Sequence, residues 1–250
     1  MKKFLLATAL AFAPLAAIQA APADVAAAVS APGRPEAATA LDAGRRPADV
    51  LRFEGLRQGD RALDLFTGSG YYGEIMARAV GPRGSVLAWN PTAFTDNDDR
   101  AALAAVHQRS PNFTFIATQA SGFALPERAF DFVMIHLNYH DTYYDVPRRQ
   151  YHMEPDAFLR TVFNSLKPGG TFAVIDHVAA PGGGDTRAVV SRFHRIDPAT
   201  VRADFERAGF VFDGESDILR NPQDDHTKGV FDPSIRGRTD RFVYRFRRPR

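Results

Sequence analysis

A short polar and aromatic segment, residues 136–144, holds the densest group of side chains capable of chemistry. It overlaps the end of an apolar stretch at residues 130–137 that is typical of a strand buried on both faces. Within the segment, His140 stands next to Asp141. A histidine beside a carboxylate can accept a proton near neutral pH, because the acid orients the ring or raises its pKa. We therefore predict that His140 is a general base assisted by Asp141, with a purely structural histidine as the alternative.

A second histidine follows another apolar stretch. Asp176 and His177 come at the end of residues 171–176, so we expect His177 at the same sheet edge as His140 and predict that it takes part in catalysis or contacts substrate. Histidines with a carboxylate also suit Zn²⁺ or a similar ion, and a metal-dependent hydrolase is a further hypothesis. No histidine pair with metal-ligand spacing lies on a clear helix, so we expect no metal at the candidate set His136, His140, Asp141, Asp176, His177 and His194.

A glycine-rich turn separates a predicted strand, residues 61–66, from a predicted helix, residues 71–80. Gly68 and Gly70 permit positive φ angles and present no Cβ, so a ligand can approach the bare backbone above the start of the helix. This arrangement holds nucleotide-like cofactors in α/β proteins. The turn is not a phosphate loop of the Gly-x-x-x-x-Gly-Lys type, because no lysine follows the glycines.

Apolar stretches and helical periodicity alternate between residues 47 and 176, which predicts a mostly parallel sheet with helices on both faces. The last third differs, because two strands separated by a long loop predict an antiparallel hairpin at the sheet edge. The expected fold is a doubly wound α/β domain with a seven-stranded, mostly parallel sheet. We expect strands at residues 61–66, 85–89, 112–117, 130–137, 171–176, 210–219 and 241–246, and helices at residues 47–56, 71–80, 98–108, 154–166 and 198–208.

The order of these pieces resembles one protein family. Residues 64–70 (Asp-Leu-Phe-Thr-Gly-Ser-Gly) resemble the first motif of class I S-adenosylmethionine-dependent methyltransferases, Asp/Glu-x-Gly-x-Gly-x-Gly, with Phe66 in place of the first glycine. Residues 130–135 (Phe-Asp-Phe-Val-Met-Ile) resemble the family's fourth strand, and residues 166–170 (Leu-Lys-Pro-Gly-Gly) resemble its turn before the fifth. The resemblance covers most of residues 47–250, in the family's order.

The resemblance implies a Rossmann-like methyltransferase fold, S-adenosyl-L-methionine as the cofactor, and methyl transfer to an unidentified acceptor, whether a small molecule or another kind of molecule. Tail residues 219–227 and 230–241 resemble a secreted subgroup of predicted methyltransferases of unassigned substrate. Asn90 stands where the family usually has an acid on the ribose hydroxyls, and Ser121 where an acid usually faces the adenine. The cofactor is expected to contact Asp64, Thr67, Gly68, Ser69, Gly70, Tyr71, Tyr72, Asn90, Ser121 and His136.

The composition excludes several classes of protein. The 250 residues contain no cysteine, which excludes disulfides, thiolate catalysis and cysteine-ligated zinc. The formal net charge is +2, and Lys2 and Lys3 account for that excess, so the rest of the chain is near neutral and we expect no nucleic-acid partner.

Residues 1–20 have the pattern of a secretory signal peptide, with two lysines, an apolar run and small residues at a cleavage site. We predict export to the periplasm or the exterior with no membrane span after cleavage; an uncleaved anchor is the alternative. Residues 21–44 are rich in Ala, Pro and Gly and are expected to form a flexible arm, with the methyltransferase-like domain at residues 45–250. Because S-adenosylmethionine is not expected to be abundant outside the cytoplasm, an exported, non-catalytic binding protein that kept the fold is a second hypothesis.

Overall fold

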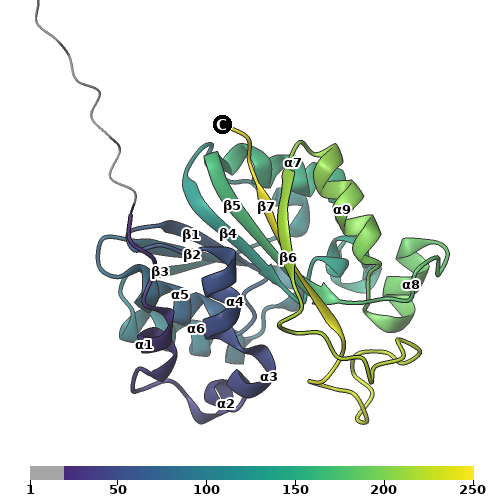
Figure 1. The fold of residues 1–250 in the computed structure, drawn as a ribbon, viewed down its shortest axis with the longest axis horizontal. Coiled ribbons are helices and arrows are strands. Elements are labelled where there is room, and N and C mark those ends of the chain that lie inside the picture. The colour runs from purple at the N-terminus through teal and green to yellow at the C-terminus, as the bar shows by residue number, and fades with distance from the viewer. Residues whose placement is uncertain (1–19) are drawn as a thin grey trace, which may run out of the picture.

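The structure, a computed structural model, describes residues 20–250 and has a seven-stranded sheet at its centre (Figure 1). The strand order is β3-β2-β1-β4-β5-β7-β6. β7 runs antiparallel to β5 and β6, and the other neighbouring strands are parallel, which confirms the predicted doubly wound α/β fold with its C-terminal antiparallel hairpin. The strands are β1 (Arg61–Leu65), β2 (Ser85–Pro91), β3 (Phe113–Thr118), β4 (Phe130–His136), β5 (Leu166–His177), β6 (Val211–Ser216) and β7 (Arg241–Arg247).

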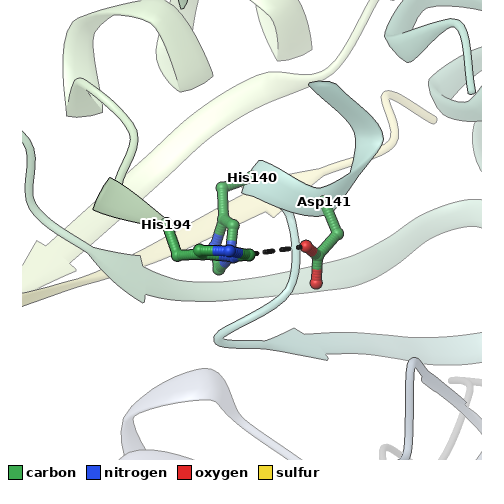
Figure 2. A group of neighbouring side chains, drawn as sticks. All are labelled: His140, Asp141 and His194. Carbon is green, nitrogen blue, oxygen red and sulfur yellow. Dashed lines mark ion pairs between the residues drawn. The ribbon is translucent and has the colours of Figure 1, made fainter. Parts of the chain in front are cut away.

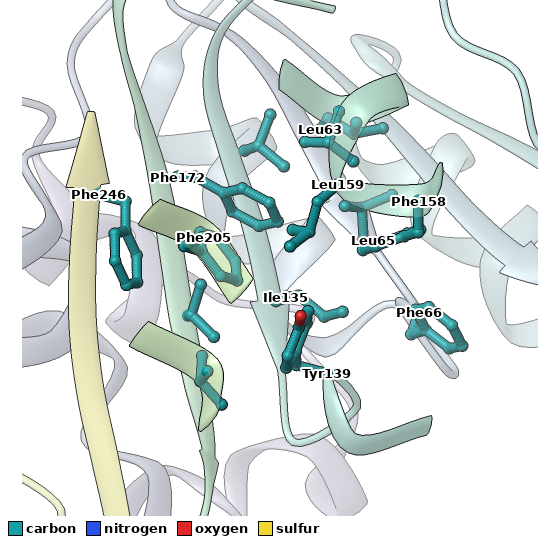
Figure 3. Packing of buried hydrophobic residues seen from close by; sticks show 14 of the residues in the cluster. Leu63, Leu65, Phe66, Ile135, Tyr139, Phe158, Leu159, Phe172, Phe205 and Phe246 are labelled. Atoms are coloured by element: carbon teal, nitrogen blue, oxygen red, sulfur yellow. The ribbon is translucent and has the colours of Figure 1, made fainter. Parts of the chain in front are cut away.

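Helices cover both faces of the sheet, and alternate strand residues serve the two layers. In β1, Leu63 and Leu65 pack into one core, whereas Ala62 packs into the other, because successive side chains of a strand point to opposite faces. Figure 3 shows the first core, where Phe158 of α7 and Phe205 of α9 belong to the same cluster as the strand residues. One layer contains α1 (Val25–Ser30), α4 (Pro47–Glu54), α5 (Tyr71–Val80) and α6 (Asn97–Arg109), and the other contains α7 (Pro155–Ser165) and α9 (Pro198–Arg207).

The chain changes its direction of travel across the sheet between β1 and β4. It moves outward from β1 through β2 to β3, and then returns to place β4 on the other side of β1. Ligands of open parallel sheets bind beyond the carboxyl ends of the strands at such a switch point, because the connections to either side diverge there. The glycine turn follows β1, and the polar segment 136–144 follows β4. The fold therefore brings together the two groups of residues that the sequence singled out.

The segment expected to be a flexible arm is structured, and that expectation is corrected. It contains α1 and two four-residue helices, α2 (Glu36–Thr39) and α3 (Asp42–Arg45). α1 packs against α4 and α5 and buries Val25 and Ala28, and the buried Arg34 pairs with Asp42 across 2.7 Å. Helices this short show no periodic apolar face in a sequence, so their order depends on contacts with distant residues that composition does not reveal.

Most predicted elements agree with the structure to within a few residues, and the exceptions have physical causes. β5 begins at Leu166, so the predicted Lys-Pro-Gly-Gly turn is part of the strand, where Gly169 donates a backbone hydrogen bond to Arg248. α8 (Thr186–Phe193) was not predicted, and Asp185 caps it by accepting from the Ala188 N–H. The predicted signal peptide falls almost wholly on residues 1–19, which lie outside the described residues. Across residues 20–250, the structure contains no helix with the length and apolar character needed to cross a bilayer.

Candidate active site

A cavity of about 390 Å³ lies beyond the carboxyl ends of β1, β2, β4 and β5. Gly68 of the glycine turn, His140 and Asp141 of the polar segment and His177 at the end of β5 all line it. Its volume falls in the range of small-molecule sites. The predicted cofactor turn and the predicted catalytic residues therefore share one cavity.

Asn90, the residue expected on the ribose, holds the glycine turn. Its Oδ1 accepts a hydrogen bond from the Gly68 N–H at 3.0 Å, and its Nδ2 donates to the Gly68 carbonyl at 3.0 Å. An amide can make both bonds at once because it carries a donor and an acceptor, which an ionised carboxylate does not. With Asn90 only 2% exposed, the structure gives it the role of a clamp on the turn.

Asp64 also holds the glycine turn, through hydrogen bonds to its carboxylate. Its Oδ2 accepts from the Thr67 hydroxyl at 2.5 Å, and the Gly73 N–H at the start of α5 also donates to the carboxylate. Burial raises the pKa of Asp64 to about 7, although these hydrogen bonds oppose the shift. Gly73 permits this close approach, because a Cβ there would lie 3.0 Å from Asp64 Oδ2 and 2.5 Å from Phe113. Asp64 and Thr67 therefore fix the conformation of the turn through hydrogen bonds to each other and to neighbouring backbone.

His140 lies in a short 3₁₀ helix, η3 (His140–Tyr143), shortly after β4. Its Nδ1 is 2.8 Å from Asp176 Oδ1, and its backbone N–H donates to Asp176 Oδ2 at 2.8 Å. Its Nε2 lies 3.5 Å from Asp141 Oδ1. Figure 2 shows His140 and Asp141 facing each other, with the His194 ring beside them. Asp176 therefore orients the His140 ring, whereas adjacency in the sequence had pointed to Asp141.

Two carboxylates control the charge of His140. Burial lowers its pKa, but Asp176 and Asp141 outweigh burial and raise the pKa to about 9. His177 shifts the other way, because burial and the nearby His140 hold its pKa well below the usual range. The His177 Nδ1 lies 2.7 Å from the Thr239 hydroxyl. At neutral pH, therefore, the His140 ring is charged and the neighbouring His177 ring is uncharged.

Three residues that line the cavity have strained backbones. Phe66, Leu137 and His194 have φ angles of 54°, 61° and 52°, in the left-handed region that favours glycine. Each such residue costs roughly 1–3 kcal/mol, and this kind of strain gathers at sites where function requires a particular geometry. Phe66 occupies the place of the motif's first glycine, so the turn keeps a glycine-like backbone without the glycine.

A second cavity, of about 620 Å³, adjoins the first and shares the wall residue His177 with it. Arg45 and Arg241 line this second cavity. The Arg241 guanidinium donates to the Gly44 and Gly237 carbonyls, and the Arg45 guanidinium stands over an aromatic ring, 4.4 Å from its centroid. Burial lowers the pKa of both arginines. Within residues 20–250 neither forms an ion pair, so this cavity favours an anionic group.

Tyr71, Tyr72 and His136 border the N-terminal helices. The Tyr71 hydroxyl donates to Asp42 at 2.6 Å, and the Tyr72 hydroxyl donates to the Arg45 carbonyl at 3.2 Å. The Tyr72 and His136 rings pack together with their centroids 4.6 Å apart. His136 Nε2 is buried with no hydrogen-bond partner among the described residues, and burial holds the His136 pKa well below its usual range.

Of the ten predicted cofactor residues, only Gly68 and Asn90 line the shared cavity, and Ser69, Gly70 and Ser121 are among those that do not. The Ser69 hydroxyl donates to Asp99 of α6 at 2.9 Å. Gly70 precedes α5, where an added Cβ would lie 3.1 Å from Leu103, so this glycine permits packing between α5 and α6. Ser121 is exposed in the 3₁₀ helix η2 (Ala120–Gly122). The structure does not bring these residues to the wall that Gly68 shares with His140.

Sequence reasoning missed several residues that line the two cavities, among them Arg45, Arg241, Asn138 and Phe231. Arg45 is the first residue of the predicted domain and ends a four-residue helix, which is too short to show a periodic pattern. Asn138 donates its Nδ2 to Asp141 Oδ2 at 2.7 Å, and the polar density of residues 136–144 was the available clue. Phe231 comes from the segment between β6 and β7 and is 62% exposed. An exposed aromatic residue at a cavity wall is visible only once the fold is known.

Comparison with known sequences points to one family. A profile described as a methyltransferase domain, Methyltransf_31, matches residues 56–216, more than half of the chain. The ubiquinone/menaquinone biosynthesis C-methyltransferases UbiE of Pasteurella multocida and Edwardsiella ictaluri are 27% and 28% identical over 126 residues, which is 49% of this chain. The matched part spans 41% and 44% of those relatives, less than half of their length.

Solved structures share the fold. A SAM-dependent methyltransferase from Aquifex aeolicus aligns with a TM-score of 0.57 and 20% identity, covering 80% of this chain and 88% of that one. The [4+2]-cyclase SpnF aligns with a TM-score of 0.58 and 20% identity, covering 83% of this chain and 82% of that one. At these identities the likeness concerns the fold alone.

Proposed function

The chain belongs to the methyltransferase-domain family, and from this premise we propose that it transfers the methyl group of S-adenosyl-L-methionine to an acceptor held in the 390 Å³ cavity. The proposal is carried by one observation, the single cavity that borders both the glycine turn and the His140–Asp141 pair. Donor and acceptor must meet within bonding distance for the transfer, and this cavity is where the two groups of residues converge.

The cofactor is proposed to lie over the glycine turn, with its amino acid end toward Arg45. Gly68 leaves open space, since an added Cβ there would meet no atom within 4 Å. Arg45 lacks an ion pair within the described residues and can pair with the cofactor's carboxylate. Asn90 keeps the Gly68 turn in a fixed conformation and so contributes by preorganisation.

Methyl transfer is a displacement at the sulfonium centre. A lone pair of the acceptor forms the new bond to the methyl carbon while the sulfur–carbon bond breaks and S-adenosylhomocysteine leaves. An O–H or N–H acceptor also loses a proton, which His140 is placed to take once it is neutral, with Asp141 beside its Nε2. His177 lines the same cavity and is proposed to contact the acceptor.

Two matched glycine variants test the proposal. Gly68 and Gly55 both have left-handed φ angles, 57° and 79°, and an added Cβ at either meets nothing within 4 Å. Gly55 follows α4, away from the cavity, so Gly55→Asp reproduces the backbone strain without the obstruction. By calorimetry on the full chain, we expect S-adenosylmethionine and S-adenosylhomocysteine to bind the wild type and Gly55→Asp, and Gly68→Asp to lose binding. The absence of binding heat for the wild type at millimolar ligand would refute the proposal.

The cellular location is a separate proposal. The signal-peptide pattern of residues 1–20 supports export to the periplasm or the exterior. Mass spectrometry of the N-terminus in fractionated cells measures this directly. We expect a chain that starts near residue 21 in the exported fraction, and an intact N-terminus in the cytoplasm contradicts export.

A further inference from the structure

We infer that His140, Asp141 and His194 form a binding site for a divalent transition-metal ion such as Zn²⁺, with one coordination position open to the 390 Å³ cavity. Within residues 20–250 this is the one group of three histidine and carboxylate residues whose ligand atoms all lie within 4.8 Å of one another. His140 and Asp141 belong to η3, whereas His194 is the residue that follows α8. Their convergence is therefore a property of the fold, whereas the sequence predicted no metal here.

The spacing of the three atoms fits a tetrahedral ion. His140 Nε2 is 3.5 Å from Asp141 Oδ1, and His194 Nδ1 is 3.9 Å from the same oxygen (Figure 2). Bonds of about 2.0–2.2 Å at tetrahedral angles place neighbouring ligand atoms roughly 3.4 Å apart. The ligand nitrogens of His140 and His194 lie within 4.8 Å of each other, so small side-chain rotations would bring the three atoms to this spacing. Two nitrogens and one oxygen form a donor set that suits zinc-like ions, whereas Mg²⁺ and Ca²⁺ prefer oxygen alone.

Neighbouring residues hold two of the ligands in the orientation that a metal needs. Asp176 binds the Nδ1 of His140 and leaves its Nε2 directed at the site. Asn138 donates to Asp141 Oδ2 at 2.7 Å and leaves Oδ1 directed at the site. A carboxylate behind a histidine ligand is a recurrent arrangement in metal proteins, because it fixes the ring and strengthens the nitrogen as a donor.

His194 is held by different means. Its φ of 52° is a left-handed backbone at the C-terminal end of α8. Its ring packs against Tyr144 and Phe231, with centroids 4.7 and 5.0 Å away. Strain of this kind persists where the surrounding structure enforces it, and here it directs an imidazole at the other two ligands.

The carboxylates around His140 also favour a bound cation. Two carboxylates, those of Asp141 and Asp176, flank His140 in a largely buried region. A divalent ion neutralises them, and buried charges are stable only when they are paired or bind a metal.

The open position identifies the class of ligand that completes the coordination. Three protein ligands leave the fourth position of a tetrahedral ion free, as in catalytic rather than structural sites. His140, Asp141 and His194 all line the cavity, so that position is taken by a water molecule or by an oxygen of the acceptor. The acceptor part of this inference depends on the proposed methyl transfer and narrows the acceptor to a hydroxyl compound, since a bound metal makes a hydroxyl more acidic. With the ion bound, His140 is a ligand and no longer the base, so its role as proton acceptor belongs to the metal-free protein.

Metal content tests the inference without any activity assay. The full chain, purified without chelator and through a tag that contains no histidine, is expected to carry about one transition-metal ion per molecule by elemental analysis. After the metal is removed, titration calorimetry with Zn²⁺ should give one site. Co²⁺ in its place should give the intense visible absorption of tetrahedral coordination. A folded wild type with neither retained metal nor heat on Zn²⁺ addition overturns the inference.

Variants separate this site from incidental surface binding. His194→Asn keeps a residue that tolerates a left-handed backbone but is too short to reach the ion, and it should lower affinity at least tenfold. Asn138→Ala leaves every ligand in place and should weaken binding by about 10–100-fold. The control is His152→Gln, because His152 is exposed between Asp145 and Glu154, each 2.6 Å away, and its loss should change nothing. Equal affinity in wild type and His194→Asn, or loss only in His152→Gln, contradicts the assignment.

The outcome is independent of the proposed function. S-adenosylmethionine binding is measured on metal-free protein, and Zn²⁺ binding is measured without the cofactor. A protein that binds the cofactor but no metal refutes this inference alone. A protein that binds the metal but no cofactor refutes the proposed methyl transfer and leaves the metal site standing.

Discussion

Replacing Asn90 with alanine removes its two hydrogen bonds to Gly68, so the variant measures how much the cofactor site depends on preorganisation. The amide of Asn90 accepts from the Gly68 N–H and donates to the Gly68 carbonyl, each at 3.0 Å. Asn90 is 2% exposed, but Gly68 is exposed and lines the cavity. Water can therefore reach the two backbone groups once the side chain is gone.

The expected loss of stability follows from that exposure. A hydrogen bond whose partners regain water contributes a net of about 0.5–1.5 kcal/mol, less than the cost of leaving a buried group unpaired. Two such bonds give a decrease of about 1–3 kcal/mol in the free energy of unfolding. For a chain of this length that corresponds to a Tm lower by roughly 2–12 °C. Binding of S-adenosylmethionine should weaken in parallel, because the ligand must then order the turn itself.

The assay pairs calorimetric unfolding with cofactor titration, and Asn112→Ala is the matched control. The Nδ2 of Asn112 donates to the carbonyls of Ala77 and Gly81 at 2.8 and 3.1 Å, beyond the amino ends of the strands and away from the cavity. This control should lower the Tm without changing cofactor affinity. An Asn90→Ala variant with an unchanged Tm but weaker binding would refute the clamp and favour a direct contact with the ribose. A lower Tm with unchanged affinity would show that the turn needs no clamp.

Three further predictions concern charge. Glu54 is buried with no hydrogen-bond partner among the described residues, and burial raises its pKa well above 4.5. The folded state therefore keeps a proton that the unfolded state loses, stability falls as pH rises, and Glu54→Gln should raise the Tm at pH 8 but barely change it at pH 4; an equal effect at both pH values contradicts this. For methyl transfer to a hydroxyl in metal-free protein, the rate should rise up to tenfold per pH unit toward the His140 pKa of about 9, and His140→Gln should flatten the profile. Asp224→Asn leaves the fully buried Arg195 without its ion pair and should cost about 3–5 kcal/mol in chemical denaturation, against at most about 1 kcal/mol for Asp145→Asn at an exposed pair.

The sheet was predictable because its strands are long enough to display their environment. β4 is apolar along nearly its whole length, since both of its faces are covered, and the turn after β1 carries the glycines that its backbone requires. His140 and Asp141 share a cavity with that turn. This position was predictable because ligands bind beyond the carboxyl ends of parallel strands. Local sequence was sufficient wherever one element alone determined the environment of its residues.

The partners of the site residues were not predictable, because they come from distant parts of the chain. Sequence adjacency assigned Asp141 to orient His140, yet Asp176, 36 residues away, binds its Nδ1. The position of Asn90 in the motif assigned it to a ligand, yet its amide is used by a turn 22 residues earlier. Arg45 lies in a four-residue helix whose place depends on distant contacts. Each case requires the strand order and the register of the sheet, which no single segment encodes.

Opposite charges in the two adjoining cavities determine how the ligands are arranged. Arg45 and Arg241 make one cavity positive, while Asp141 and Asp176 bring negative charge to the wall of the other, and His177 lies between them. In the proposed binding mode of the metal-free protein, this field orients S-adenosylmethionine with its carboxylate at the arginines and its sulfonium toward the carboxylates. The methyl group then faces the His140 side of the boundary. Under this proposal the departures from the family motif do not alter the direction of the cofactor, because Asn90 shapes the turn and the orienting charges come from residues outside the motif.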